Sequence, residues 1–154
     1  MLLTVVMVGG LLACRSGVES APPSAGPPRG QVTFPSGRVF SVELALTAQD
    51  QARGYMGRRK IAPDEGMLFV YHRPATRQFW MKNCLVPIDM IWLDDEDRVV
   101  ATEPNAPPCR EDPCPAYGPV IPTYSVLEVA GGTVSHEGLE PGDRLLIVTD
   151  ESLE

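Results

Sequence analysis

The chain has 154 residues and a formal net charge of −7, which leaves room for one folded domain and a short appendage. The charge is unevenly spread, because residues 53–82 hold seven Lys or Arg against two acids, whereas residues 83–154 hold three Arg against fifteen acids. A chain that is acidic along its second half, with one basic stretch, argues against nucleic acid as a partner of the whole domain.

The first thirteen residues are almost entirely apolar and end at Cys14. Twelve residues of this kind form a helix of about 18 Å, shorter than the ~30 Å hydrocarbon core of a bilayer. Residues 1–13 are therefore typical of a signal peptide with a small residue at the cleavage site. The stretch Leu11-Leu12-Ala13-Cys14 resembles the lipobox of bacterial lipoproteins, in which the cysteine is acylated and becomes the mature N-terminus.

This resemblance predicts a lipid-anchored protein on the extracytoplasmic side of a bacterial membrane. Arg15 follows the cysteine where an inner-membrane retention signal would have Asp, which favours the periplasmic side of the outer membrane. Stable anchoring by acyl chains requires more than one of them. The alternative is an apolar leader that ends in an unmodified cysteine.

Residues 15–30 are mainly Pro, Gly, Ser and Ala, and they have little to bury. Together with Cys14 they predict a lipidated tether over residues 14–30. An oxidising compartment would allow a disulfide between Cys109 and Cys114, which bracket four residues. Such a small ring stabilises a fold by roughly 2 kcal/mol. Metal binding by the pair is the alternative, and Cys84 is expected to be a buried free thiol.

A single domain is predicted for residues 31–154. Residues 35–37, Pro-Ser-Gly, lie between two apolar stretches, 32–34 and 38–46, which predicts a β-hairpin. The second stretch alternates apolar and polar residues, as a strand with one buried face does.

Thr47 and Asp50 have the spacing of a helix N-cap and its partner, so a short helix is expected from there to about Tyr55. A turn is expected at residues 72–76, around a proline. The remaining strands are predicted at residues 66–71, 78–82, 88–93, 98–102, 124–129 and 144–149.

Two irregular segments complete the pattern. Four consecutive acids at residues 94–97 predict a solvated hairpin tip, since they lack the spaced ligands and the glycine of a calcium loop. Residues 104–122 contain seven prolines and predict a long loop pinned by the disulfide. About seven short, mostly antiparallel strands and one short helix predict a mainly β (α+β) fold, a small barrel or sandwich.

Residues 79–93 form the densest apolar run outside the leader and contain both tryptophans, with the polar residues Lys82, Asn83 and Asp89 inside it. An unpaired carboxylate at Asp89 would be costly in such a run. We therefore expect hydrogen bonds to it from the turn at residues 83–86, with Lys82 or Arg53 as a counter-charge.

Asp89 and Glu128 each interrupt a strand that otherwise predicts burial. If the two carboxyl groups faced each other, they could act as the acid and base of a hydrolase. The structural alternative is that backbone groups satisfy Asp89 while Glu128 pairs with Arg53 or Lys82.

The methionines suggest a second, less favoured possibility. Thioether sulfurs bind Cu(I), and His72 or Cys84 could complete an extracytoplasmic copper site. Methionine more often fills gaps in a core. The four methionines of this hypothesis are Met56, Met67, Met81 and Met90.

Seven short motifs together resemble domain-of-unknown-function family 192 over residues 31–149. This resemblance implies a compact, mostly β domain that is often exported, and it implies no activity. The chain differs from the family at Cys84, where Thr is usual, and at Tyr55, where Leu is usual. The motifs are, in order, Arg53-Gly54-Tyr55-Met56, Gly66-Met67-Leu68-Phe69, Phe79-Trp80-Met81-Lys82-Asn83, Pro87-Ile88-Asp89-Met90, Pro113-Cys114-Pro115, Val126-Leu127-Glu128 and Gly142-Asp143.

The sequence thus predicts a membrane-anchored, non-enzymatic binding or accessory domain, with a hydrolase and a copper protein as alternatives. Its partners are the membrane and a small molecule or protein of unknown identity. Neither a cofactor nor a metal is expected. The candidate pocket residues are Arg53, Trp80, Lys82, Asn83, Asp89 and Glu128.

Overall fold

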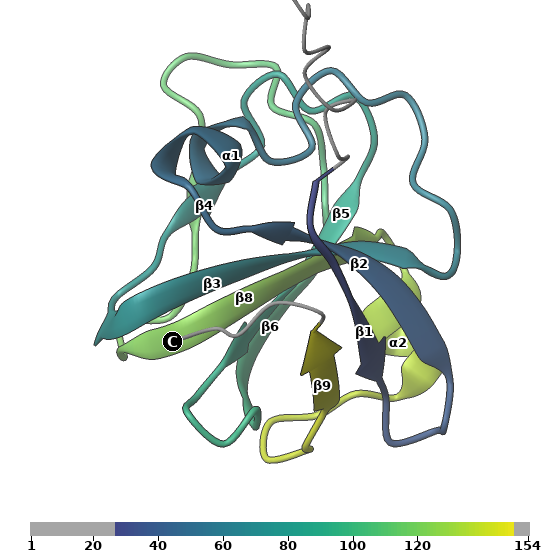
Figure 1. Ribbon diagram of the computed structural model, residues 1–154. Helices are drawn as coiled ribbons and strands as arrows, with labels where there is room; N and C mark the ends of the chain where they lie inside the picture. The colour runs from purple at the N-terminus through teal and green to yellow at the C-terminus, as the bar shows by residue number, and fades with distance from the viewer. Residues whose placement is uncertain (1–26, 150–154) are drawn as a thin grey trace, which may run out of the picture.

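The computed structural model describes residues 27–149. The predicted signal peptide, the lipidation of Cys14 and most of the tether lie outside these residues. Within them the chain forms nine strands and two short helices (Figure 1). The strands are β1 Arg29–Thr33, β2 Val39–Ala45, β3 Glu65–Ala75, β4 Phe79–Trp80, β5 Ile88–Leu93, β6 Val99–Ala106, β7 Ala116–Tyr117, β8 Thr123–Ala130 and β9 Leu146–Thr149; the helices are α1 Ala48–Arg53 and α2 Thr133–Glu137.

Seven strands form one sheet in the order β6-β5-β8-β3-β2-β1-β9, in which only the β2–β3 pair is parallel. Its two edge strands approach each other at one end, where Arg98 and Arg144 form a bridge and the Val99 amide donates to the Asp143 carbonyl at 2.8 Å. The sheet is therefore a barrel closed at one end only (Figure 1). The prediction of a mainly β fold is confirmed.

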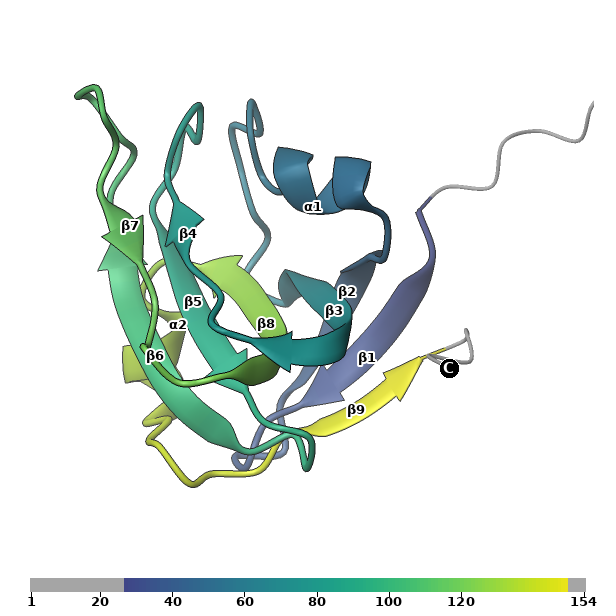
Figure 2. The same cartoon turned by 90° about the vertical axis from the view of Figure 1, so that its left-hand side faces the viewer.

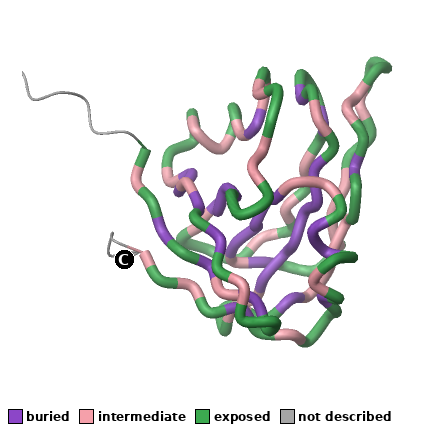
Figure 3. The backbone as a smooth tube through the Cα atoms, turned by 90° about the vertical axis from the view of Figure 1, so that its right-hand side faces the viewer, coloured by how far each residue is buried: buried purple, intermediate pink, exposed green. Residues whose placement is uncertain are grey.

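The central strands are buried on both faces, which explains their continuous apolar runs. All six residues of β5 are buried, and its five apolar residues alternate between two clusters. Figure 3 shows that the buried parts of the chain run through the middle of the molecule. Ile91 and Leu93 join an inner cluster with residues from β1, β2, β3 and β8, so this cluster fills the barrel. Met90 and Trp92 join an outer cluster on the opposite face of the sheet.

The outer cluster is covered by loops rather than by a second full layer. Tyr55, Met81 and Cys84 come from two such loops and are buried in this cluster, and Phe79 of β4 packs against it. Figure 2 shows α1 and the β4–β7 ribbon at the same end of the molecule. Two of the molecule's cavities lie on the outer face at this end.

Several local predictions are confirmed. Strands β1 and β2 pair as an antiparallel hairpin, although β1 runs from Arg29 to Thr33 rather than over residues 32–34. The Thr47 hydroxyl accepts from the Asp50 amide at 3.1 Å and caps α1. The helix ends at Arg53, two residues earlier than predicted, because Gly54 has φ of +44° and leaves the helical conformation.

Strands β3 and β6 continue well past their predicted ends, and both contain proline. The turn expected at residues 72–76 belongs mostly to β3, which continues to Ala75 with a shift in register after Val70. Strand β6 runs through Pro104, which lies in a register shift of an edge strand. Bulges and edges are where a strand tolerates a residue without an N–H group.

The predicted strand 78–82 is reduced to the two residues of β4, which pair with β7 inside the expected long loop. Helix α2 was not predicted at all. The acidic segment 94–97 is a hairpin tip as expected, since Asp94 Oδ1 accepts the amides of Glu96 and Arg98, both at 2.9 Å.

The three cysteines within residues 27–149 are arranged as predicted. Cys109 and Cys114 form a disulfide with a Cα–Cα distance of 5.8 Å, and Cys84 is a buried free thiol. The disulfide closes a small ring just before β7, and Cys109 is partly buried against the outer cluster.

Candidate ligand-binding site

Asp89 is fully buried and binds three backbone amides. Its Oδ1 accepts from Asn105 at 2.6 Å and from Gly132 at 2.8 Å, while Oδ2 accepts from Val134 at 2.6 Å. Gly132 is the N-cap of α2 and has no side chain to satisfy the first amides of the helix. Asp89 supplies the missing acceptor from a neighbouring strand.

The prediction of which groups bind Asp89 is therefore wrong. The observed donors come neither from residues 83–86 nor from Lys82 or Arg53. The bulge in β6 turns the Asn105 amide away from the sheet ladder, and Asn105 has φ of +56°. The amide is then free to bind Asp89.

Asp89 and Glu128 do not face each other. In the pairing of β5 with β8, Asp89 lies opposite Val129, whereas Glu128 lies opposite Met90. Directly paired residues share a face of the sheet, and successive residues alternate. Glu128 therefore lies on the outer face and Asp89 on the inner one, so the acid–base pair of the hydrolase hypothesis is not formed.

Glu128 is isolated within the outer cluster. The register places it between Met67 of β3 and Met90 of β5, and it is 5% exposed. Its Oε2 has no hydrogen-bond partner among the described residues, and burial raises the pKa of its carboxyl group to about 8. The suggested ion pair with Arg53 or Lys82 is absent from residues 27–149, so the group is mainly neutral at pH 7.

The segment Gly54–Met56 lies over Glu128. A Cβ atom at Gly54 would be 3.7 Å from Glu128 Oε2 and 3.3 Å from the ring of Phe69. This close approach and the positive φ both require glycine. Desolvation, with a smaller effect of the Glu128 charge, raises the pKa of Tyr55 and raises that of Cys84 to about 11. The Cys84 thiol is therefore protonated and unsuited to nucleophilic attack.

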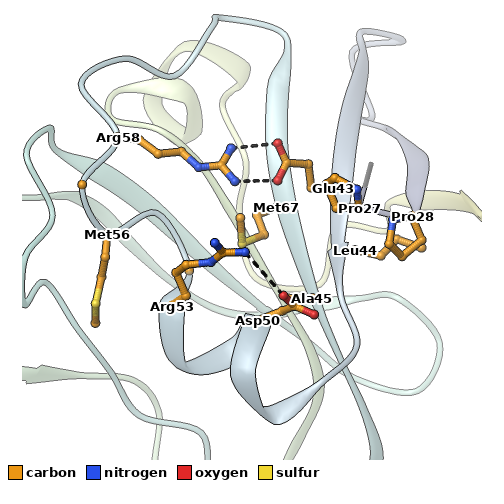
Figure 4. A pocket seen from close by; sticks show the side chains of 12 residues that line it. Pro27, Pro28, Glu43, Leu44, Ala45, Asp50, Arg53, Met56, Arg58 and Met67 are labelled. Carbon is orange, nitrogen blue, oxygen red and sulfur yellow. Dashed lines mark hydrogen bonds and ion pairs between the residues drawn. The ribbon is translucent and has the colours of Figure 1, made fainter. Parts of the chain in front are cut away.

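A cavity of about 620 Å³, the α1 cavity, opens on one side of this segment (Figure 4). It is formed by β2, β3, α1, the loop after α1 and the chain that leads into β1. Its lining residues are Pro27, Pro28, Glu43, Leu44, Ala45, Asp50, Arg53, Gly54, Met56, Gly57, Arg58 and Met67.

Two arginines of the α1 cavity pair with two acids (Figure 4). Arg58 donates to both carboxylate oxygens of Glu43, at 2.8 and 2.5 Å, and its guanidinium lies 4.9 Å from the centre of the Tyr55 ring. The hydrogen bonds lower the pKa of Glu43 and raise that of Arg58. Arg53 lies 3.7 Å from Asp50, a much looser contact.

A smaller cavity of about 180 Å³ lies across the same segment, with Arg53, Gly54 and Met56 in the walls of both. Trp80 borders it and is 52% exposed. The Lys82 ammonium lies 5.4 Å from the centre of the Trp80 ring. Gly54–Met56 thus forms a wall between two hollows, with Glu128 underneath.

The predicted pocket residues fall into three groups. Arg53 and Trp80 line cavities, and Glu128 lies below them. Asn83 supports the wall, since its carbonyl accepts the Gly57 amide at 2.9 Å, and Lys82 contacts Trp80. Asp89 is on the other face and belongs to no cavity wall described above.

The sequence did not identify Glu43, Asp50, Met67 or Arg58 as pocket residues. Only Arg58 carried a signal, as part of the basic stretch after α1. The other three residues fit an ordinary strand or helix cap, and only the parallel β2–β3 pairing brings Glu43 beside Met67.

The methionines of the copper hypothesis are mostly core residues. Met67, Met81 and Met90 are buried in the outer cluster with Cys84, while His72 is exposed on β3. Within residues 27–149, no three His, Cys, Asp or Glu side chains gather as a metal site would require.

The sequence model of domain-of-unknown-function family 192 (DUF192), described as an uncharacterised ACR, matches residues 31–147. The chain belongs to the DUF192 family. The first DUF192 motif, residues 53–56, contributes to the two cavities. The later motifs, from Gly66 to Asp143, place residues on both faces of the sheet, so they do not gather at a single site.

Two solved structures resemble this DUF192 protein. A protein of unknown function from Novosphingobium aromaticivorans is 33% identical, with a TM-score of 0.70, and the match covers 90% of this chain and 99% of that one. A proposed transcription regulator from Sinorhizobium meliloti is 33% identical, with a TM-score of 0.68, and the match covers 82% and 97%. No curated protein matches the chain. Across residues 27–149, no helix has the length and apolar character needed to cross a bilayer.

Proposed function

We propose that this DUF192 protein is a non-enzymatic, small-molecule-binding domain, held on the extracytoplasmic side of a bacterial membrane by a lipid on Cys14. The observation that carries the binding function is the α1 cavity of about 620 Å³. Its volume is within the range of about 300–1,000 Å³ that is usual for ligand sites. Strands β2 and β3 provide the floor, and charged groups stand in an otherwise apolar wall.

The arrangement of titratable groups favours binding over catalysis. The Asp89 carboxylate is occupied by three amides. Glu128 has no titratable partner within hydrogen-bond reach among the described residues, and the Cys84 thiol is protonated. A general acid or base needs a substrate proton or a second group within hydrogen-bond distance. The charged groups that do meet the α1 cavity are arginine–carboxylate pairs, which suit recognition.

The membrane location is supported by the leader and by the position of the tether. Pro27 and Pro28 belong to the last part of the predicted tether, residues 14–30, and form part of the α1 cavity wall. A ligand in this cavity would therefore lie beside the chain that leads to the anchor.

The binding function is tested by native mass spectrometry of the protein purified from its own cells. We expect a bound small molecule on the wild type. Met56→Trp should weaken or remove its binding, because Met56 lines both cavities and the larger ring would occupy part of the space that the ligand needs. Leu85→Trp is the matched control, since Leu85 is 52% exposed and lies outside both linings. A wild type without ligand, or equal loss in both variants, would contradict the proposal.

The anchor is tested by labelling cells with radioactive palmitate and separating their membranes. The wild-type protein should carry the label and stay with the membranes. Cys14→Ser should lose both properties. Label that persists in Cys14→Ser would show that the anchor was wrongly assigned.

A further inference from the structure

We infer that the ligand of the α1 cavity carries a carboxylate or phosphate group on an apolar body, and that Arg53 binds this anionic group. The inference rests on the proposed binding function and names the class of its ligand. It follows from the different states of the two arginines in the cavity and from the remainder of the wall.

Arg58 is already occupied. Its two terminal nitrogens bind the two oxygens of Glu43 side by side, and Tyr55 lies against its guanidinium. A bidentate pair of this kind has fixed geometry and uses the guanidinium fork. Arg58 and Glu43 therefore form a rigid, electrically balanced part of the wall.

Arg53 is held far more loosely. Its side chain is 72% exposed, and its contact with Asp50 is 3.7 Å long. Asp50 is engaged elsewhere, because its Oδ2 accepts the Thr47 hydroxyl at the start of α1. Within residues 27–149, the Arg53 side chain has no other hydrogen bond or ion pair. Arg53 and Met67 are both among the residues that line the α1 cavity (Figure 4).

A guanidinium with free donors at the mouth of a cavity matches a planar carboxylate or a phosphate, which can accept two of its N–H groups. A cationic ligand would meet the exposed charge of Arg53, whereas Glu43 is occupied by Arg58 and Asp50 accepts the Thr47 hydroxyl. Glu128 below the wall adds little negative potential at pH 7, because burial raises the pKa of its carboxyl group to about 8.

The rest of the wall is apolar and selects the body of the ligand. Ala45 and Met67 belong to the sheet and are part of the outer cluster, and Pro27 and Met56 line the same cavity. Apolar ligand surface gains about 25 cal/mol for each Å² removed from water. An alkyl chain or ring therefore fits this wall better than a sugar does.

Isothermal titration calorimetry with four decyl compounds tests the inference on the full chain, below their micelle concentrations. The probes are decanoate, decyl phosphate, decyl maltoside and decyltrimethylammonium, which share one chain and differ in the head group. At least one anion should bind about tenfold or more tightly than the neutral and cationic probes, since a charge-assisted pair exceeds a neutral one. The two anionic probes distinguish a carboxylate ligand from a phosphate ligand.

Arg53→Gln should weaken binding of the preferred anion by about tenfold or more, and Arg53→Lys by less, because lysine keeps the charge but loses the fork. Arg59→Gln is the matched control, since Arg59 is exposed in the same basic loop and lies outside the lining. Arg53 is exposed, so its variants should fold.

The outcomes separate the two proposals. Equal affinity for all four head groups, or unchanged anion binding by Arg53→Gln, would overturn the inference and leave the binding function in place. Failure of every decyl probe would also overturn it. The binding function would still be tested by native mass spectrometry of the wild type and of Met56→Trp, because that experiment detects the native ligand and does not use the decyl probes.

Discussion

The Asp89 carboxylate links three segments that are distant in the chain. Its three amide donors are 16, 43 and 45 residues away, in the β6 bulge and at the start of α2. The apolar neighbours of Asp89 predicted that it would be buried and hydrogen-bonded. They could not predict its partners, because nothing near Asp89 in sequence specifies which distant loops pack against β5.

Asp89→Asn should destabilise the fold by about 2–3 kcal/mol, because the amide can accept with one oxygen only and its NH₂ group would meet a backbone donor. The measurement is urea denaturation. Asp95→Asn is the control, since Asp95 is exposed in the acidic turn. A variant as stable as the wild type would remove the capping role assigned to Asp89.

Glu128 should make stability fall as pH rises from about 4.5 to about 8. Its folded pKa, about 8, is above the ordinary value of 4.5, so over this range the folded state holds a proton that the unfolded state releases. The unfolding free energy then decreases by up to about 1.4 kcal/mol per pH unit.

The test compares urea denaturation of the wild type and Glu128→Gln at pH 5, 6, 7 and 8. The variant cannot ionise, so the difference between the two proteins isolates Glu128 from all other titrating groups. We expect the variant to gain on the wild type with each step in pH. A constant difference would show that the folded carboxyl group ionises normally.

Among the elements, the turn and cap signals predicted most of the hairpins and α1, since each depends on neighbouring residues. The extents of β3 and β6 were misjudged because proline usually ends a strand, and only the bulges and the edge position of β6 accommodate it. Helix α2 was missed because its N-cap is a glycine, and the carboxylate that binds its first amides belongs to Asp89 in the distant strand β5.

Gly54→Ala should lower the free energy of unfolding by about 1–3 kcal/mol, because Gly54 is part of the wall between the two cavities. The added Cβ would require a strained backbone at φ +44° and would press against Phe69 at 3.3 Å. Gly57→Ala is the matched control, because Gly57 also has positive φ but its Cβ would meet no atom within 4 Å. Thermal and urea denaturation should therefore rank Gly54→Ala below Gly57→Ala, and equal losses would mean that only backbone strain matters.

The Cys109–Cys114 disulfide should stabilise the fold by about 2 kcal/mol, as expected for a small ring. The double variant Cys109→Ser/Cys114→Ser measures this in urea. In the non-reduced wild type, an alkylating reagent should modify Cys84 only after unfolding, because that thiol is buried. Alkylation of Cys109 without reductant would contradict the disulfide.

At the scale of the whole molecule, composition and strand pattern were enough for the fold class, because a mainly β domain needs only short alternating or apolar strands and turns. They were not enough for the site. Asp89 and Glu128 both sit in apolar strands, but the face that each occupies depends on the register of β5 against β8. A shift of one residue would have placed them together, and neither strand alone encodes that register.

The partly closed barrel predicts the order in which its strands open to solvent. Strands β3, β5 and β8 have paired neighbours on both sides and buried faces, whereas β9 pairs only with β1 and exposes 63% of Leu146. Residues just before β9 close the barrel, since the Leu145 amide donates to the Asp97 carbonyl at 3.0 Å. Protection from hydrogen exchange follows such differences in pairing and burial.

Hydrogen-exchange mass spectrometry should therefore find the slowest amides in β3, β5 and β8 and the fastest sheet amides in β9, with residues 142–145 intermediate. Arg144→Ala should speed exchange at residues 142–145, because Arg144 Nε donates to the Glu96 carbonyl at 2.9 Å across the closure. Arg110→Ala, in the exposed disulfide loop, should leave these residues unchanged. If β9 exchanged as slowly as β5, the sheet would be closed along its whole edge and not at one end.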